Sequence, residues 1–79
     1  MPTILYVKGY RFFFYSQEGN EPMHIHVTKA DAVAKLWLEP ELTAVFFVGF
    51  TVKEQREIMQ LGKENYALLK MKWNEYFGK

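Results

Sequence analysis

The chain has 79 residues, with 10 Lys and Arg against 9 Asp and Glu and a formal net charge of +1 at pH 7. This length allows a single domain, 1–79, and so small a charge excludes a strongly basic nucleic-acid-binding protein or an acidic disordered tail. The absence of Cys excludes disulfides, thiol catalysis and Cys-ligated zinc. We expect no signal peptide, and no apolar run reaches the ~18 residues that a membrane helix needs, so we expect a cytoplasmic protein with no membrane contact.

The first part of the chain predicts about five short strands within residues 3–48. Each strand is a run rich in β-branched and aromatic residues, bounded by turn residues. Between the second and third runs, residues 17–23 are predicted to form a loop that turns at Gly19 and Asn20. The five predicted strands are residues 3–7, 10–16, 24–28, 32–38 and 42–48.

One C-terminal helix is predicted over about residues 52–77. Thr51 and Glu54 have the spacing of a capping box, and the apolar residues beyond them recur at helical intervals. Gly78 stands where a helix C-cap is expected, and Gly62 indicates either a kink or a close contact with the sheet. The predicted fold is therefore α+β, an antiparallel sheet of about five short strands covered on one face by one C-terminal helix (β-β-β-β-β-α).

Because one helix covers only one face of a sheet, the functional candidates are the side chains on the other face. Successive strand residues alternate between the two faces, and matching the apolar sets of the third and fourth strands sets Ile25 opposite Leu36. In the second strand, the set that contains no charge is expected to face the helix. The open face then contains rings, imidazoles and cations but no acid: Arg11, Phe13, Tyr15, His24, His26, Lys35 and Trp37.

Three functions remain open for this face. Aromatic residues make up 18% of the chain, more than a small core buries easily, and rings with Arg are enriched at protein interfaces. The same mixture suits RNA, with a histidine of the pair His24 and His26 as general acid or base and with Arg11 and Lys35 stabilising the developing charge. The two imidazoles, about 6.5–7 Å apart at alternate strand positions, are also weak candidates for metal binding. No cofactor is expected.

Several runs of the sequence resemble a known small bacterial family, domain-of-unknown-function family 4160. These runs are MPTI at the start, GYRFFFYS at 9–16, EPMHIHV at 21–27, AKLWL at 34–38 and WNEYF at 73–77. The family typically has a second Pro where Met23 stands here. The resemblance implies no established reaction, but it implies a toxin–antitoxin-like pair with the product of a neighbouring gene. It also implies that Glu21 belongs to the functional set, with Arg11, Tyr15, His24, His26, Lys35 and Trp37.

Together these observations predict a small cytosolic interaction protein that resembles a toxin–antitoxin component. It would dock a partner protein, or a second copy as a homo-oligomer, through the aromatic and histidine face of the sheet. The alternative is a ribonuclease-like enzyme that uses His24 and His26 with Arg11 and Lys35. The third hypothesis is a metal-binding module built on His24 and His26.

Overall fold

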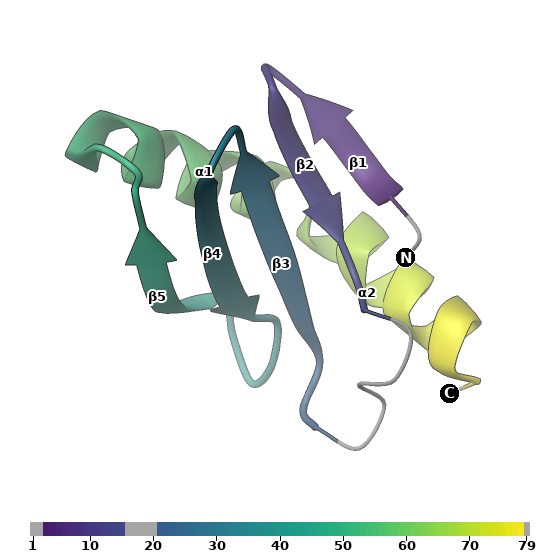
Figure 1. The fold of residues 1–79 in the computed structure, drawn as a ribbon. Helices are drawn as coiled ribbons and strands as arrows, with labels where there is room; N and C mark the ends of the chain where they lie inside the picture. Colours follow the sequence, from purple (N-terminus) through teal and green to yellow (C-terminus); the bar gives the residue numbers. More distant parts are fainter. Residues whose placement is uncertain (1–2, 16–20, 79) are drawn as a thin grey trace.

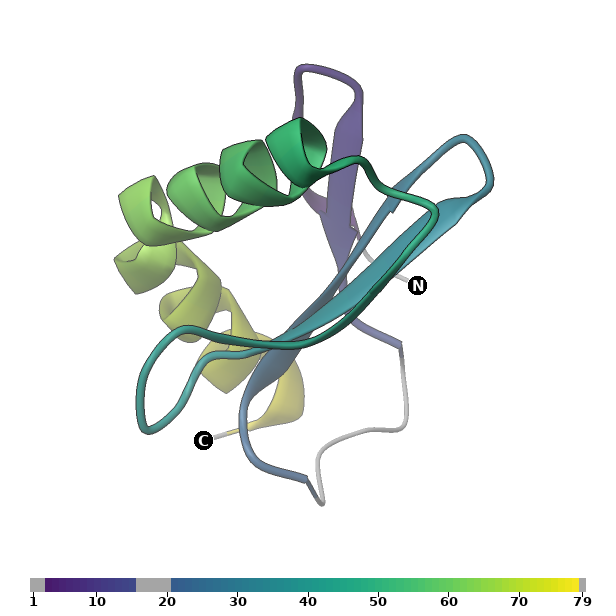
Figure 2. The ribbon, with the colours of Figure 1, turned by 90° about the vertical axis from the view of Figure 1, so that its left-hand side faces the viewer.

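The computed structural model describes residues 3–15 and 21–78, which form a five-stranded antiparallel sheet with two helices on one face (Figures 1 and 2). The α+β class predicted from the sequence is confirmed. The strands follow their order in the chain across the sheet, so β1 and β5 are its edges. The elements are β1 (Thr3–Val7), β2 (Tyr10–Phe13), β3 (His24–Lys29), β4 (Ala32–Trp37), β5 (Thr43–Val48), α1 (Val52–Glu64) and α2 (Tyr66–Phe77).

The prediction of one C-terminal helix is wrong, because two helices occupy this segment. They are separated at Asn65, whose φ of −112° and ψ of 17° are not helical. The Asn65 side-chain amide donates a hydrogen bond of 2.8 Å to the carbonyl oxygen of Leu61, which is how short polar side chains compete with helical bonding. Gly62 stays within α1, and a Cβ there would lie 3.2 Å from Leu42 Cδ2. Gly62 therefore marks a close helix–sheet contact rather than the kink.

Both predicted ends of the helical segment are confirmed. Thr51 and Glu54 form a capping box, in which each residue's backbone N–H donates to the other's side chain, at 2.9 and 3.1 Å. The hydrogen bond from the Thr51 backbone is the main cause that lowers the pKa of Glu54. At the other end, Gly78 adopts a left-handed conformation with a φ of 77°. Thr51 thus sets the start of α1, and Gly78 sets the end of α2.

The strand register sets which side chains face the helices. Ile25 pairs with Leu36 across β3 and β4, as predicted, and Phe13 pairs with His26 across β2 and β3. β2 ends at Phe13, before the predicted end at residue 16, and the predicted turn at 19–20 lies outside the described residues. The core between sheet and helices contains Tyr10, Phe12, Phe14, Ile25, Val27, Leu36, Ile58, Leu61, Leu69 and Trp73.

Tyr10 joins the sheet to α1 and makes the domain sensitive to alkaline pH. Its phenol donates a hydrogen bond of 2.6 Å to Glu57 Oε1. Burial, followed by the hydrogen bond and charge of Glu57, raises the pKa of Tyr10 well above its ordinary value. An unfolded tyrosine ionises near pH ~10, so the contribution of Tyr10 to the free energy of unfolding is complete below that pH. It is lost as the pH rises further.

We therefore expect Tyr10→Phe to flatten the alkaline fall in stability. Urea denaturation of both proteins from about pH 8 to about pH 11 measures this, because the variant has no phenol proton to lose. Tyr6→Phe is the matched control, since Tyr6 on β1 is exposed and should leave the pH dependence unchanged. An alkaline slope in Tyr10→Phe equal to that of the natural chain would contradict the prediction.

Candidate functional site

The face of the sheet opposite the helices, which is turned toward the viewer in Figure 1, contains the predicted functional residues on neighbouring strands. His26 on β3 pairs with Phe13 on β2 and with Lys35 on β4, so one row of side chains crosses three strands. We call the side chains of this row and its neighbours the ring surface: Arg11, Phe13, Tyr15, His26, Lys35 and Trp37.

The rings on β2 and β3 pack on one another. Tyr15 meets His26 edge-on, with 4.5 Å between ring centroids, and meets Phe13 edge-on at 5.1 Å. The Arg11 guanidinium lies 4.5 Å from the centre of the Phe13 ring. Because its neighbours cover it, Phe13 is only 2% exposed, whereas Tyr15 is 45% exposed. Phe13 is therefore a buried ring against which the rings of Tyr15 and His26 pack.

His24 is placed differently from the other predicted site residues. The alternation of side chains puts it on the open face, but the structure buries it completely. Its ring centroid lies 5.1 Å from Trp73 on α2 and 5.7 Å from Trp37, and its Nδ1 donates a hydrogen bond of 2.9 Å to the Pro22 carbonyl oxygen. His24 is the first residue of β3, where the end of the sheet meets α2. Its role is to join the ring surface to the core.

Glu21 corrects the expectation that the open face lacks an acid. Its Oε1 lies 3.0 Å from Lys35 Nζ and 3.8 Å from His24 Nδ1. The Lys35 ammonium also lies 4.8 Å from the centre of the Trp37 ring. Strand alternation missed Glu21 because this residue precedes β3. The resemblance to the family, through the EPMHIHV run, is what had placed Glu21 in the functional set.

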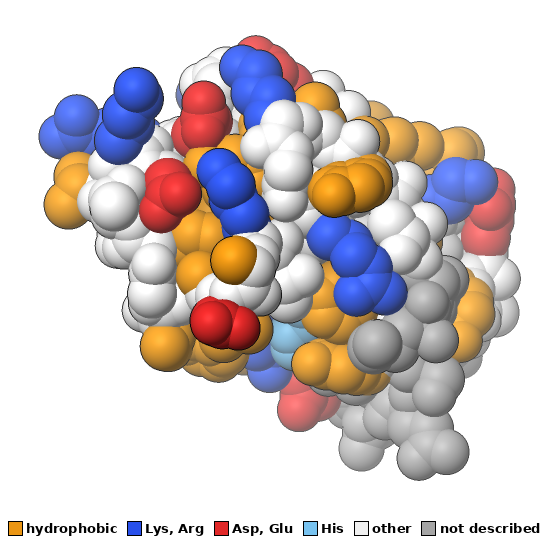
Figure 3. All heavy atoms as spheres, turned by 45° about the horizontal axis from the view of Figure 1, so that its top comes forward, with side chains coloured by type: hydrophobic (Ala, Val, Ile, Leu, Met, Phe, Trp, Pro, Cys, Tyr) orange, Lys and Arg blue, Asp and Glu red, His pale blue; other side chains and the backbone are white. Residues whose placement is uncertain are grey.

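A hollow of about 210 Å³ opens on this face beside the ring surface. Binding sites for small molecules are generally larger, about 300–1,000 Å³, so the hollow suits a single inserted side chain better. Apolar side chains on β4 and β5 extend the surface beyond the hollow. Figure 3 shows hydrophobic side chains exposed between charged ones on the side of the molecule that it draws. The set predicted from the sequence did not include Val33 on β4 or Phe46 on β5. The residues that line the hollow include Phe13, Tyr15, His26, Thr28, Val33 and Phe46.

The described residues also bear on metal binding and on membrane insertion. Within residues 3–15 and 21–78, no three His, Asp or Glu side chains gather as metal ligands would. Neither α1 nor α2 has the length and apolar character of a membrane-spanning helix. The described residues of the ring surface present aromatic rings, the His26 imidazole and the cations Arg11 and Lys35, of which Lys35 is paired with Glu21.

The fold and this surface define a small α+β domain with an aromatic and histidine sheet face. A family model described as "Domain of unknown function (DUF4160)" matches residues 9–74, and the chain belongs to this family. The matched range contains every residue of the ring surface together with His24 and Glu21. Searches of curated proteins and of solved structures found no significant match.

Proposed function

We propose that the protein is a small cytosolic interaction module that docks another protein through the ring surface. The observation that supports this most is the exposure of large side chains around the hollow on the face that lacks helices. Tyr15 and Phe46 are exposed at its border, and Trp37 is partly exposed nearby. Tyr, Trp and Arg are the side chains that most often dominate binding energy at protein interfaces.

The charge of this surface favours a different protein over a second copy as the docked chain. Arg11 and Lys35 are cationic, His26 becomes cationic when protonated, and Glu21, the acid that the described residues place beside them, is paired with Lys35. Two copies meeting face to face would bring like charges together, which is costly at an interface. The complementary partner has an apolar or aromatic side chain for the hollow and acidic side chains around it.

The product of the neighbouring gene is the partner that we propose, in a toxin–antitoxin-like pair. Co-expression of the two chains, followed by size-exclusion chromatography with light scattering, tests this. We expect one complex that contains both chains, and we expect Arg11→Glu, which places an acid against the acidic partner, to dissociate it. Separate elution of the two natural chains would refute the proposed partner.

Action on RNA is the second candidate function, and one observation favours it. Glu21, Lys35 and His24 form a connected polar cluster beside His26, which supplies the carboxylate that a histidine acid–base site needs. Because His24 is buried, the contact with substrate would fall to His26. Incubation of the protein with single-stranded RNA, beside a His26→Ala variant, decides the matter. Cleavage that the variant loses supports it, and equal inertness of both proteins removes it.

A further inference from the structure

The outer edge of β5 is open and unusually apolar. β5 is the last strand of the sheet, and no other segment of residues 3–15 and 21–78 pairs with its outer side. Its sequence, TAVFFV, contains no charge and no proline, the residues with which proteins usually protect an edge strand. Phe46 is 42% exposed and Val48 is 56% exposed. Such an edge is a template for another strand.

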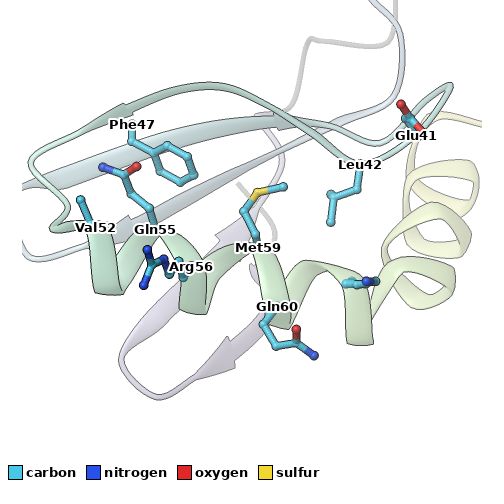
Figure 4. Close-up of a pocket in the computed structure, with 9 residues that line it drawn as sticks. Glu41, Leu42, Phe47, Val52, Gln55, Arg56, Met59 and Gln60 are labelled. Carbon is cyan, nitrogen blue, oxygen red and sulfur yellow. The ribbon is translucent and has the colours of Figure 1, made fainter.

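A groove runs beneath this edge, between β5 and α1 (Figure 4). Its volume is about 720 Å³, and Phe47 from β5 and Met59 from α1 point into it. Polar and charged side chains, including Glu41, Arg56 and Lys63, border it. A strand added to β5 would therefore send alternate side chains into an apolar groove while its backbone pairs with the open edge.

We propose that this strand is β5 of a second copy, paired antiparallel about a two-fold axis. β5 meets this requirement itself, because it is extended and apolar. Its pairing with β4 is regular over Phe46–Val48, beyond the register shift between Lys35 and Leu36. An antiparallel pair of identical strands is self-complementary, which is the symmetry that most homodimers use. The two sheets would then form one continuous sheet.

The charges at the two ends of β5 fit this arrangement. Glu41 precedes the strand, and Lys53 and Arg56 lie in the first half of α1, which follows it. Antiparallel pairing reverses the second copy, so its Glu41 comes to the end of β5 where α1 begins. There it meets cations and the positive end of the helix dipole. In the described part of the chain neither Glu41 nor Arg56 forms an ion pair, so both are available.

This inference goes beyond the proposed function, because the β5 edge contains none of the ring-surface residues, although Phe46 of β5 also lines the hollow next to them. Pairing through an edge leaves the open face of each copy accessible to a partner. Both interactions can therefore occur in one assembly, and each can fail without the other.

Sedimentation equilibrium of the full chain over a wide concentration range tests the proposal. We expect a dimer, weakened about tenfold by Glu41→Arg or by Arg56→Glu and restored when both substitutions are combined, because the swap rebuilds each ion pair. Val48→Lys should abolish the dimer, because lysine at an edge opposes strand addition. Circular dichroism establishes that each variant is folded.

Two control variants keep the result specific. Met71→Lys introduces the same charge at an exposed position on α2 and should leave the dimer unchanged. Trp37→Ala should leave the dimer intact even where it prevents partner docking, which separates this proposal from the proposed function. A chain that stays monomeric at all concentrations overturns the inference. A dimer that neither charge reversal weakens, or that the double swap does not restore, overturns it as well.

Discussion

Replacing Trp73 with alanine is expected to lower the free energy of unfolding by about 3–5 kcal/mol, the usual cost of truncating a buried large ring. Trp73 lies on α2 and is only 3% exposed. Its ring centroid is 4.2 Å from Phe77, 5.2 Å from Phe14 and 5.1 Å from His24, so the indole fills the space between the helix, the sheet and the ring surface. A domain of this length has only about 4–12 kcal/mol in total, so the expected loss is at least about a quarter of its stability.

Urea denaturation followed by circular dichroism measures this loss, and Trp37→Ala is the matched control. Both changes remove an indole, but Trp37 lies on the open face and is partly exposed, so its truncation leaves no comparable cavity. We expect the Trp37 variant to keep most of the stability that the Trp73 variant loses. Similar losses in the two variants would show that the two faces of the sheet are equally buried, contrary to the structure.

Trp37→Ala is expected to weaken binding of the docked partner by about thirtyfold or more, corresponding to the ~2 kcal/mol that defines an interface hot spot. Trp37 lies beside the Lys35 ammonium and the buried His24 ring, which hold it in place before a partner arrives. A side chain that is already ordered loses little conformational entropy on binding. Its indole can therefore contribute most of its contact energy to the complex.

Isothermal titration calorimetry with the neighbouring gene product measures the effect. Met71→Ala is the control, because Met71 is an exposed apolar side chain on α2, on the far side of the sheet. The control should bind as the natural chain does. Should Met71→Ala weaken binding as much as Trp37→Ala, the partner would occupy the helical layer rather than the ring surface.

The sheet was predictable from the sequence because each strand has local signals. Alternation within the third and fourth runs gave the pairing of Ile25 with Leu36 and of His26 with Lys35, since a slip by one residue would have turned the apolar set outward. The capping residues Thr51 and Gly78 likewise gave the ends of the helical segment. In each case, residues adjacent in the sequence determine the structure.

The features that the sequence did not reveal depend on contacts between distant segments. The apolar spacing continues through Asn65, so periodicity gave no sign that the chain changes from α1 to α2 there. The burial of His24 depends on where α2 packs, because Trp73 is what covers its ring. The exposure of Phe46 depends on β5 being an edge, and alternation within a strand does not say which strands lie inside a sheet.

The order of the strands has a consequence for how the chain reaches this structure. Each strand pairs with the strand next to it in the sequence, so we expect the sheet to assemble by closing loops between neighbouring strands rather than by joining distant segments. Short loops cost little entropy to close, and domains rich in local contacts reach their native state faster than those that join distant segments. The hairpin of β3 and β4, joined through the turn at Ala30, is a natural starting point to which β2 and β5 add from either side.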